Sequence, residues 1–177
     1  MKFNKVFAGV VALFVFAAPQ AMAEEGHQHK PYVGSQAFEQ MKGLVGSWEG
    51  TMDAGKGPEK VALSYKLTAF DSALVETVFE GTPHEMVSVY HDDSKRKLTM
   101  THYCSEHNQP KLTLTSMKGN QLNLDLSKDS DIDVAKEAHI HAASIQFDGK
   151  DKVVQRWTSF EGGKERQVVE IAYKRVQ

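Results

Sequence analysis

The stretch EMVSVYHDDSKRKLTMTHY, residues 85–103, decides the fold of this chain. Apolar and polar residues alternate along both of its halves, and a polar segment at 92–95 separates them. This pattern is typical of a β-hairpin with one buried face. If residues 92–95 form the loop, Glu85 pairs with His102 on the largely apolar side of the hairpin. The hairpin therefore predicts a β-fold with a carboxylate and an imidazole facing inward.

Similar segments fill most of the remaining chain. Polar or glycine-containing turns such as Gly81-Thr82 and Asp148-Gly149 separate them, and the connections are too short for crossover helices. The sequence therefore predicts an all-β fold, a closed antiparallel up-and-down barrel of about ten strands, with a β-sandwich as the alternative. The expected strands are Leu44–Met52, Lys60–Ala69, Ala73–Phe79, Glu85–His91, Lys97–Tyr103, Lys111–Met117, Gln121–Leu126, Ala138–Phe147, Lys152–Phe160 and Arg166–Arg175.

The N-terminal third of the chain predicts three further segments. Lys2 and Lys5 precede a short apolar run and an Ala-Met-Ala site, so residues 1–23 are expected to be a cleaved signal peptide. Residues 24–34 are expected to be a flexible leader with a His-x-His pair. Ser35 is a plausible cap for a short helix that ends before Gly43, and residues 35–177 are expected to form the barrel domain. The protein is therefore expected to be periplasmic or secreted.

The turns also predict which side chains share the inner surface. Pairing across the turns at 71–72, 81–82 and 92–95 places polar and apolar side chains on one face of four successive strands. That face is expected to hold Tyr65, Leu67, Glu76, Val78, Glu85, Val87, Met100 and His102. An inward Glu or His is costly unless it is paired or bound to a ligand. Three interpretations of these inward polar side chains remain open: a cluster whose members bond only to one another, a ligand pocket, and a metal or catalytic centre.

His139 and His141 share one strand face with Ile145 and Phe147, which favours that face as the inner one. Two imidazoles at i and i+2 on a strand lie about 7 Å apart, a spacing that suits shared coordination of one metal ion. A zinc or other divalent metal site on His102, His139 and His141 is therefore one hypothesis.

Charge and cysteine content limit the classes of function. Loss of residues 1–23 removes two lysines and takes the net charge from −2 to −4, which gives no electrostatic reason to bind nucleic acid. No second apolar run of transmembrane length occurs in the sequence. Cys104 is the single cysteine, so no internal disulfide can form, and a buried thiol is its default interpretation.

The segment LVGSWEG, residues 44–50, follows the expected helix and opens the first strand. Its G-x-W-x-G motif resembles the start of lipocalin-like (calycin) barrels, in particular the nitrobindin-like group. The resemblance implies that Trp48 closes the barrel floor and that the interior holds a ligand. Nitrobindin-like barrels bind haem through a histidine near the C-terminus, but no histidine follows His141, so haem is the less favoured cofactor. The runs GTPHEM, THYC and NQP also resemble a group of uncharacterised bacterial exported proteins.

These patterns favour an exported barrel that binds a small hydrophobic molecule. The expected ligand-binding residues are Tyr65, Glu76, Glu85, Met100, His102, His139, His141 and Trp157, with Val78 and Val87 in the apolar wall. The main alternative is a metal-dependent or acid–base enzyme that uses Glu85, His102, His139 and His141. The third interpretation is a structural or interaction protein whose interior is filled with side chains.

Overall fold

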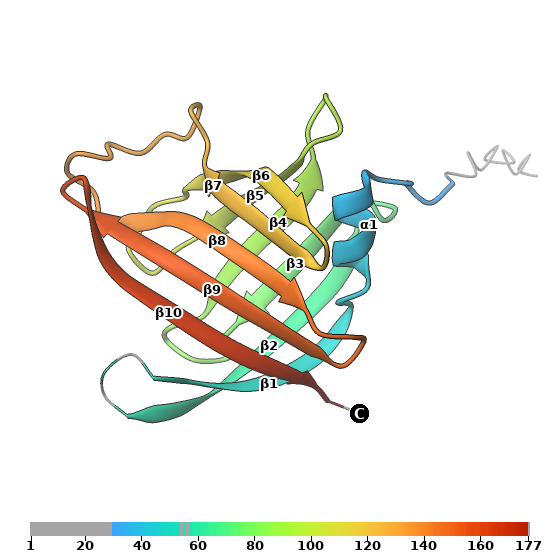
Figure 1. The fold of residues 1–177 in the computed structure, drawn as a ribbon, viewed down its shortest axis with the longest axis horizontal. Coiled ribbons are helices and arrows are strands. Elements are labelled where there is room, and N and C mark those ends of the chain that lie inside the picture. The colour runs from blue at the N-terminus through green and yellow to red at the C-terminus, as the bar shows by residue number, and fades with distance from the viewer. Residues whose placement is uncertain (1–29, 54, 56, 177) are drawn as a thin grey trace, which may run out of the picture.

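Ten antiparallel strands form a closed barrel in the computed structural model of this protein, which describes residues 30–53, 55 and 57–176. Each strand pairs with its neighbours in sequence, and β1 closes the barrel by pairing with both β2 and β10 (Figure 1). The strands are β1 Gly46–Asp53, β2 Pro58–Thr68, β3 Ala73–Val78, β4 Met86–Asp92, β5 Leu98–Tyr103, β6 Lys111–Lys118, β7 Gln121–Leu126, β8 His139–Phe147, β9 Lys152–Glu161 and β10 Lys164–Arg175.

The predicted fold class is therefore confirmed, including its up-and-down order and its short N-terminal helix. The expected signal peptide, residues 1–23, and most of the expected leader lie outside the described residues. Of the helices in the described part of the chain, none is long and apolar enough to cross a membrane.

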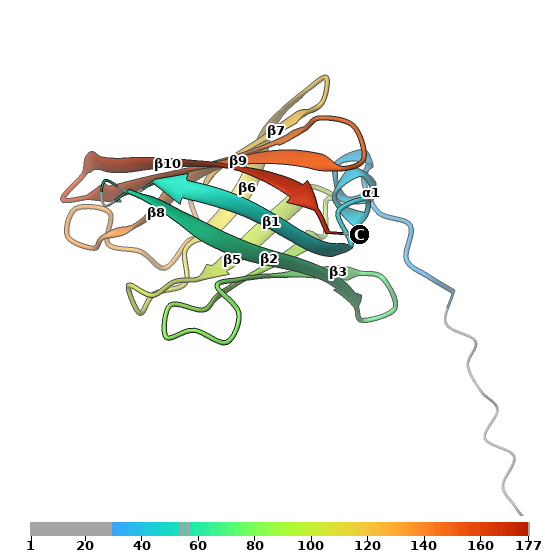
Figure 2. The same ribbon diagram turned by 90° about the horizontal axis from the view of Figure 1, so that it is seen from below.

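Helix α1, Gln36–Lys42, lies at one end of the barrel (Figures 1 and 2). The Ser35 hydroxyl accepts a hydrogen bond from the Phe38 amide at 3.2 Å, which caps the first turn. Phe38 and Met41 face inward and are fully buried. The carboxylate of Asp92, at the end of β4, accepts hydrogen bonds from the Ser35 amide and hydroxyl. These contacts fix the helix against the barrel wall, so this end of the barrel is packed with side chains.

Trp48 joins the helix end of the barrel to both chain-terminal strands. Its indole donates to the Leu44 carbonyl at 2.7 Å, and the ring is 1% exposed. The Arg175 guanidinium lies 4.2 Å from the ring centroid, and it donates to the Gly43 and Val45 carbonyls, each at 2.7 Å. Trp48 thus links β1, β10 and the end of α1 through packing and hydrogen bonds.

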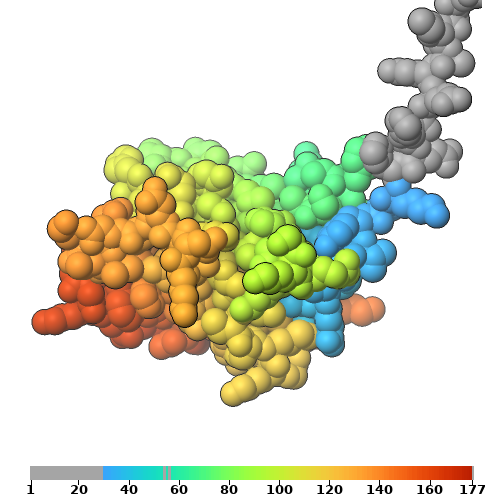
Figure 3. All heavy atoms as spheres, turned by 90° about the horizontal axis from the view of Figure 1, so that it is seen from above, coloured from blue at the N-terminus to red at the C-terminus, as the bar shows by residue number. Residues whose placement is uncertain are grey.

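The opposite end of the barrel carries longer connections. The segment 127–138 between β7 and β8 lies beside the β9–β10 hairpin, as Figure 3 shows in orange and red. A β-bulge in β8, between Ile140 and Ala142, leaves His141 without a pairing partner on β9. Because a bulge inserts one residue, it exchanges the inward and outward positions of the strand on its two sides.

Candidate functional site

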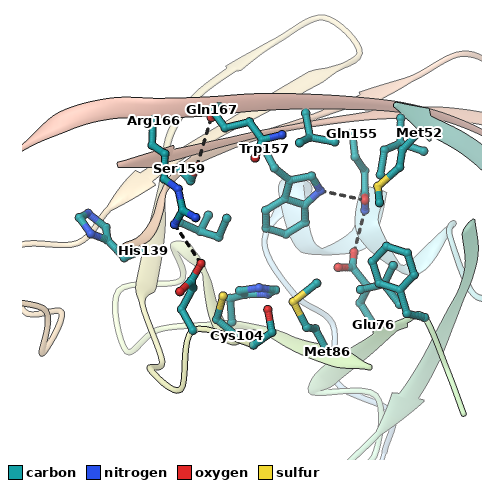
Figure 4. Close-up of a pocket in the computed structure, with 18 of the residues that line it drawn as sticks. Met52, Glu76, Met86, Cys104, His139, Gln155, Trp157, Ser159, Arg166 and Gln167 are labelled. Atoms are coloured by element: carbon teal, nitrogen blue, oxygen red, sulfur yellow. Dashed lines mark hydrogen bonds and ion pairs between the residues drawn. The ribbon is translucent and has the colours of Figure 1, made fainter. Parts of the chain in front are cut away.

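The barrel encloses a cavity of about 270 Å³ that opens at the end away from α1 (Figure 4). Its wall is mainly apolar, and polar side chains gather at its deep end and at its mouth. The apolar wall comes from Met52, Val78, Phe79, Met86, Ile140, Trp157, Val169 and Ile171. The polar lining residues are Glu76, His102, Cys104, Ser105, Glu106, His139, Gln155, Ser159, Arg166, Gln167 and Tyr173.

Glu76 on β3 is the centre of the deep end and is 1% exposed. Its carboxylate accepts hydrogen bonds from the Ser88 hydroxyl at 3.1 Å, the Tyr90 hydroxyl at 3.0 Å and the Gln155 amide at 2.7 Å. The Tyr65 hydroxyl is a fourth hydrogen-bond partner. Burial raises the pKa of Glu76, and these four bonds oppose that rise. Four converging partners compensate the loss of water around a buried carboxylate.

His102 on β5 extends this network toward the cavity. Its Nδ1 atom lies 3.0 Å from the Ser88 hydroxyl oxygen, and the imidazole is 3% exposed. The Trp157 ring packs against it, with ring centroids 5.2 Å apart. Burial lowers the pKa of His102 to about 4, so the imidazole is neutral at pH 7. Glu76, Ser88 and His102 thus form one hydrogen-bonded chain.

Two further polar side chains complete the deep end. Gln155 donates to Glu76 and accepts a hydrogen bond from the Trp157 indole at 3.1 Å, so it orients the largest side chain of the wall (Figure 4). Tyr173 is 1% exposed, and within the described residues its hydroxyl has no hydrogen-bond partner. Burial and the nearby Glu76 raise its pKa. An unpaired buried hydroxyl costs about 1–3 kcal/mol, so a cavity occupant that bonded to it would be stabilised.

The mouth of the cavity is polar and exposed. An Arg166 nitrogen lies 3.0 Å from a Glu106 oxygen, so this ion pair joins β10 to the β5–β6 loop beside the cavity (Figure 4). Cys104 lines the same region, is partly buried and has no disulfide partner. Burial raises the pKa of its thiol, which argues against a reactive thiolate.

The predicted position of Glu85 is wrong. Ser88, rather than Val87 or Glu85, faces the interior, because Asp92 pairs with Leu98 and the hairpin loop spans residues 93–97. Ser88 therefore lies opposite His102, where Glu85 was expected, three residues earlier in the chain. A displacement by an odd number of residues reverses which side chains of β4 face inward. Glu85 is exposed at the rim, where its carboxylate accepts a hydrogen bond from the Gly81 amide at 2.6 Å. Val87 pairs with the exposed Tyr103 on the outer face, so it does not contribute to the cavity wall.

His139 and His141 were both expected to face the cavity, and the structure bears this out for His139 alone. His139 is 1% exposed and lines the cavity, whereas His141 is only partly buried and is not a lining residue. Ala143 and Ile145 are buried as expected, but the bulge at His141 reverses the alternation before it. His139 pairs with Phe160, and the His141 ring stacks on Phe160 with centroids 4.0 Å apart. His139 contacts the cavity at the end far from Glu76, as Figure 4 shows.

The three histidines of the proposed metal site do not assemble. His139 Nε2 lies 3.1 Å from His141 Nδ1, and His139 Nδ1 donates to the Glu137 carbonyl. His102 instead bonds to Ser88 inside the barrel. In the described residues, no group of three or more His, Cys, Asp or Glu side chains is arranged to hold a metal ion.

The other predicted residues occupy the interior, in two layers. Glu76, His102 and Trp157 line the cavity. Tyr65 and Met100 are buried but do not line the cavity, and the Tyr65 hydroxyl is a hydrogen-bond partner of Glu76. Sequence reasoning missed Ser88, Tyr90, Gln155 and Tyr173. Gln155 and Tyr173 alternate with apolar residues in expected strands, so the same face argument could have found them.

A pair of tyrosine variants tests this network. Tyr90→Phe removes a hydrogen bond to Glu76 and is expected to lower the free energy of unfolding by about 1–3 kcal/mol. Tyr173→Phe removes a hydroxyl without a partner in the described residues, so stability is expected to stay level or rise slightly. Urea unfolding of both variants measures the difference. Equal losses in the two variants would show that Glu76 does not depend on its donors.

The pH dependence of stability provides a second test. The pKa of His102 falls from 6.5 to about 4 on folding, so the unfolded chain binds more protons between these values. The stabilising contribution of neutral His102 is complete above pH 6.5 and is lost as the pH falls toward 4, up to about 3 kcal/mol. Burial raises the pKa of Glu76, which acts in the opposite direction.

Comparison with His102→Leu isolates the histidine contribution, because Glu76 is present in both proteins. Urea unfolding at several pH values from 4 to 7 is expected to show a steeper acid loss in the unsubstituted protein. Parallel stability curves would show that the imidazole remains accessible to protons in the folded state.

Comparisons with known proteins support the fold and go no further. No family model matches the sequence, and no curated protein matches it. Among solved structures, the chain is similar to a protein of unknown function from the DUF3598 family of Nostoc punctiforme, with a TM-score of 0.52 and 13% identity. The match covers 83% of this chain and 51% of that one, so this chain spans about half its length. The likeness is compatible with a calycin-like barrel and shows the fold alone.

Proposed function

We propose that this chain is an exported calycin-like barrel that binds one small, largely apolar molecule with a polar group at one end. The observation that carries the proposal is the cavity itself. It combines an apolar wall with two polar groups, His102 and Tyr173, that have hydrogen-bonding capacity to spare. Pockets of this composition are typical of small-molecule sites, in which a few polar groups fix the orientation of the ligand.

An acid–base enzyme is the second candidate, because the Glu76–Ser88–His102 chain orients an imidazole toward the cavity. The pKa of about 4 weakens this candidate, since a general base works best with a pKa near the operating pH. The exposed Glu85 plays no part in such a centre. The binding function therefore accounts better for the neutral imidazole.

Native mass spectrometry of protein purified from its expression host tests the proposal. The denatured mass is expected to correspond to a chain beginning at Glu24, and the native mass to include one additional organic molecule. An added metal ion would favour the His139–His141 pair as a binding site instead. A native mass equal to the denatured mass, after mild purification, would contradict the carrier function.

A cavity-filling variant makes this experiment specific. Val169 lines the cavity, so Val169→Trp is expected to remove the additional mass. Val134 is 44% exposed and does not line the cavity, so Val134→Trp is the matched control. Retention of the additional mass by Val169→Trp would place the bound molecule outside the barrel.

A further inference from the structure

The hydrogen bonds around Glu76 determine which atom of His102 carries the proton. The single hydroxyl proton of Ser88 is donated to Glu76, so the Ser88 oxygen acts as acceptor toward His102. His102 Nδ1 must therefore carry the imidazole proton. Because the imidazole is neutral, Nε2 keeps its lone pair and has no partner among the described residues. The deep end of the cavity thus presents a hydrogen-bond acceptor.

Tyr173 supplies the complementary donor. Tyr173 lines the same cavity, and its buried hydroxyl has no partner in the described residues. The charge of Glu76 contributes to its raised pKa, so the two side chains lie near each other. His102 is joined to the same Glu76 through Ser88. An acceptor nitrogen and a free hydroxyl therefore occupy the same polar end. A ligand hydroxyl can donate to the first and accept from the second.

The charges around the cavity exclude an anionic ligand. The Glu76 carboxylate is negative when it accepts from all its partners, and it lies at the deep end. Arg166 is the one lysine or arginine among the lining residues, and it lies at the mouth, paired with Glu106. A carboxylate ligand at the deep end would lose its hydration without gaining a cation.

The size and wall of the cavity limit the body of the ligand. A protein cavity of about 150 Å³ accommodates benzene. The volume here is about 270 Å³, which leaves room for one or two fused rings. Phe79 and Trp157 offer aromatic contacts, and the sulfur atoms of Met52 and Met86 pack well against ring edges.

We propose that the ligand is a neutral aromatic alcohol of one or two rings, whose hydroxyl donates to His102 Nε2 and accepts from the Tyr173 hydroxyl. This inference rests on the proposed binding function and names its ligand class. The Ser88–Glu76 chain makes the selection, because it holds His102 in the tautomer that accepts from the ligand.

Isothermal titration calorimetry with three matched probes tests the ligand class. The mature protein is expected to bind 2-naphthol at least tenfold more tightly than 2-methoxynaphthalene, which cannot donate a hydrogen bond. It is expected to bind 2-naphthoate more weakly still. Equal affinity for the alcohol and the ether, preference for the carboxylate, or no binding of 2-naphthol would each overturn the ligand class. An organic molecule of another class in the native mass spectrum would retain the binding function while this inference fails.

Two variants test the roles of the named groups. Tyr173→Phe is expected to keep or slightly raise its stability and to lose about tenfold in affinity for 2-naphthol, whereas Tyr103→Phe, at an exposed position, is expected to lose no affinity. Ser88→Ala removes the hydrogen-bond partner that keeps the imidazole proton of His102 on Nδ1. Nε2 then no longer acts solely as an acceptor, so the preference for 2-naphthol over its ether is expected to shrink. Unchanged affinity and preference in both variants would overturn the assignment.

Discussion

Glu76→Leu is expected to lower the free energy of unfolding by about 3–5 kcal/mol, the first of the two largest effects we anticipate. The substitution removes a buried charge, which by itself is favourable. It also leaves several buried polar groups without an acceptor, among them the Tyr90 hydroxyl and the Gln155 amide. Several unpaired groups in one network outweigh the relief of one desolvated carboxylate. Urea unfolding of the variant measures the loss.

Glu85→Leu is the matched control. Glu85 is also a glutamate and immediately precedes β4, the strand next to that of Glu76. Its side chain is exposed, however, and accepts one hydrogen bond from the Gly81 amide. Its substitution is expected to change stability by no more than about 0.5 kcal/mol. Similar losses for the two variants would contradict the assignment of Glu76, rather than Glu85, to the interior.

The second large effect is expected for Trp48→Ala, a loss of about 3–5 kcal/mol. The indole is 1% exposed, bonds to the Leu44 carbonyl and lies under the Arg175 guanidinium. Its removal opens a void where β1, β10 and α1 meet. Thermal and urea unfolding, followed by circular dichroism, measure the loss.

Trp157→Ala is the internal comparison, because the chain contains two tryptophans. Trp157 is only partly buried and borders an existing cavity, so less packing is lost. We expect a smaller loss of stability, together with loss of ligand binding. A larger loss for Trp157→Ala than for Trp48→Ala would contradict the view that Trp48 holds the closed end of the barrel.

The strand content and order were predictable because alternation and turn residues act locally. The register of the β4–β5 hairpin could not be predicted in this way. The expected 92–95 loop is in fact 93–97, and Arg96 adopts a left-handed conformation with φ of 59°. No glycine marks that position, so the sequence carries no signal for the longer turn. The resulting three-residue displacement of β4 against β5 replaced Glu85 and Val87 by Ser88 and Tyr90 on the inner face.

The bulge at His141 explains the second difference. Ile145 correctly indicated the inner face of the later part of β8, but the extra residue reverses the preceding part. The position of Glu76 was predictable because the turn before β3 preserved its parity, and that of His102 because it alternates with the buried Leu98 and Met100. The link between them through Ser88 depends on register across three strands, which residue patterns alone do not determine.

Nitrogen-15 NMR of the His102 imidazole tests the central claim most directly. At pH 7 we expect Nδ1 to carry the proton and Nε2 to be bare, and we expect the Nε2 resonance to shift when 2-naphthol is added. A proton on Nε2, or a resonance unaffected by a probe that calorimetry shows to bind, would contradict the assignment of His102 as the acceptor in the cavity.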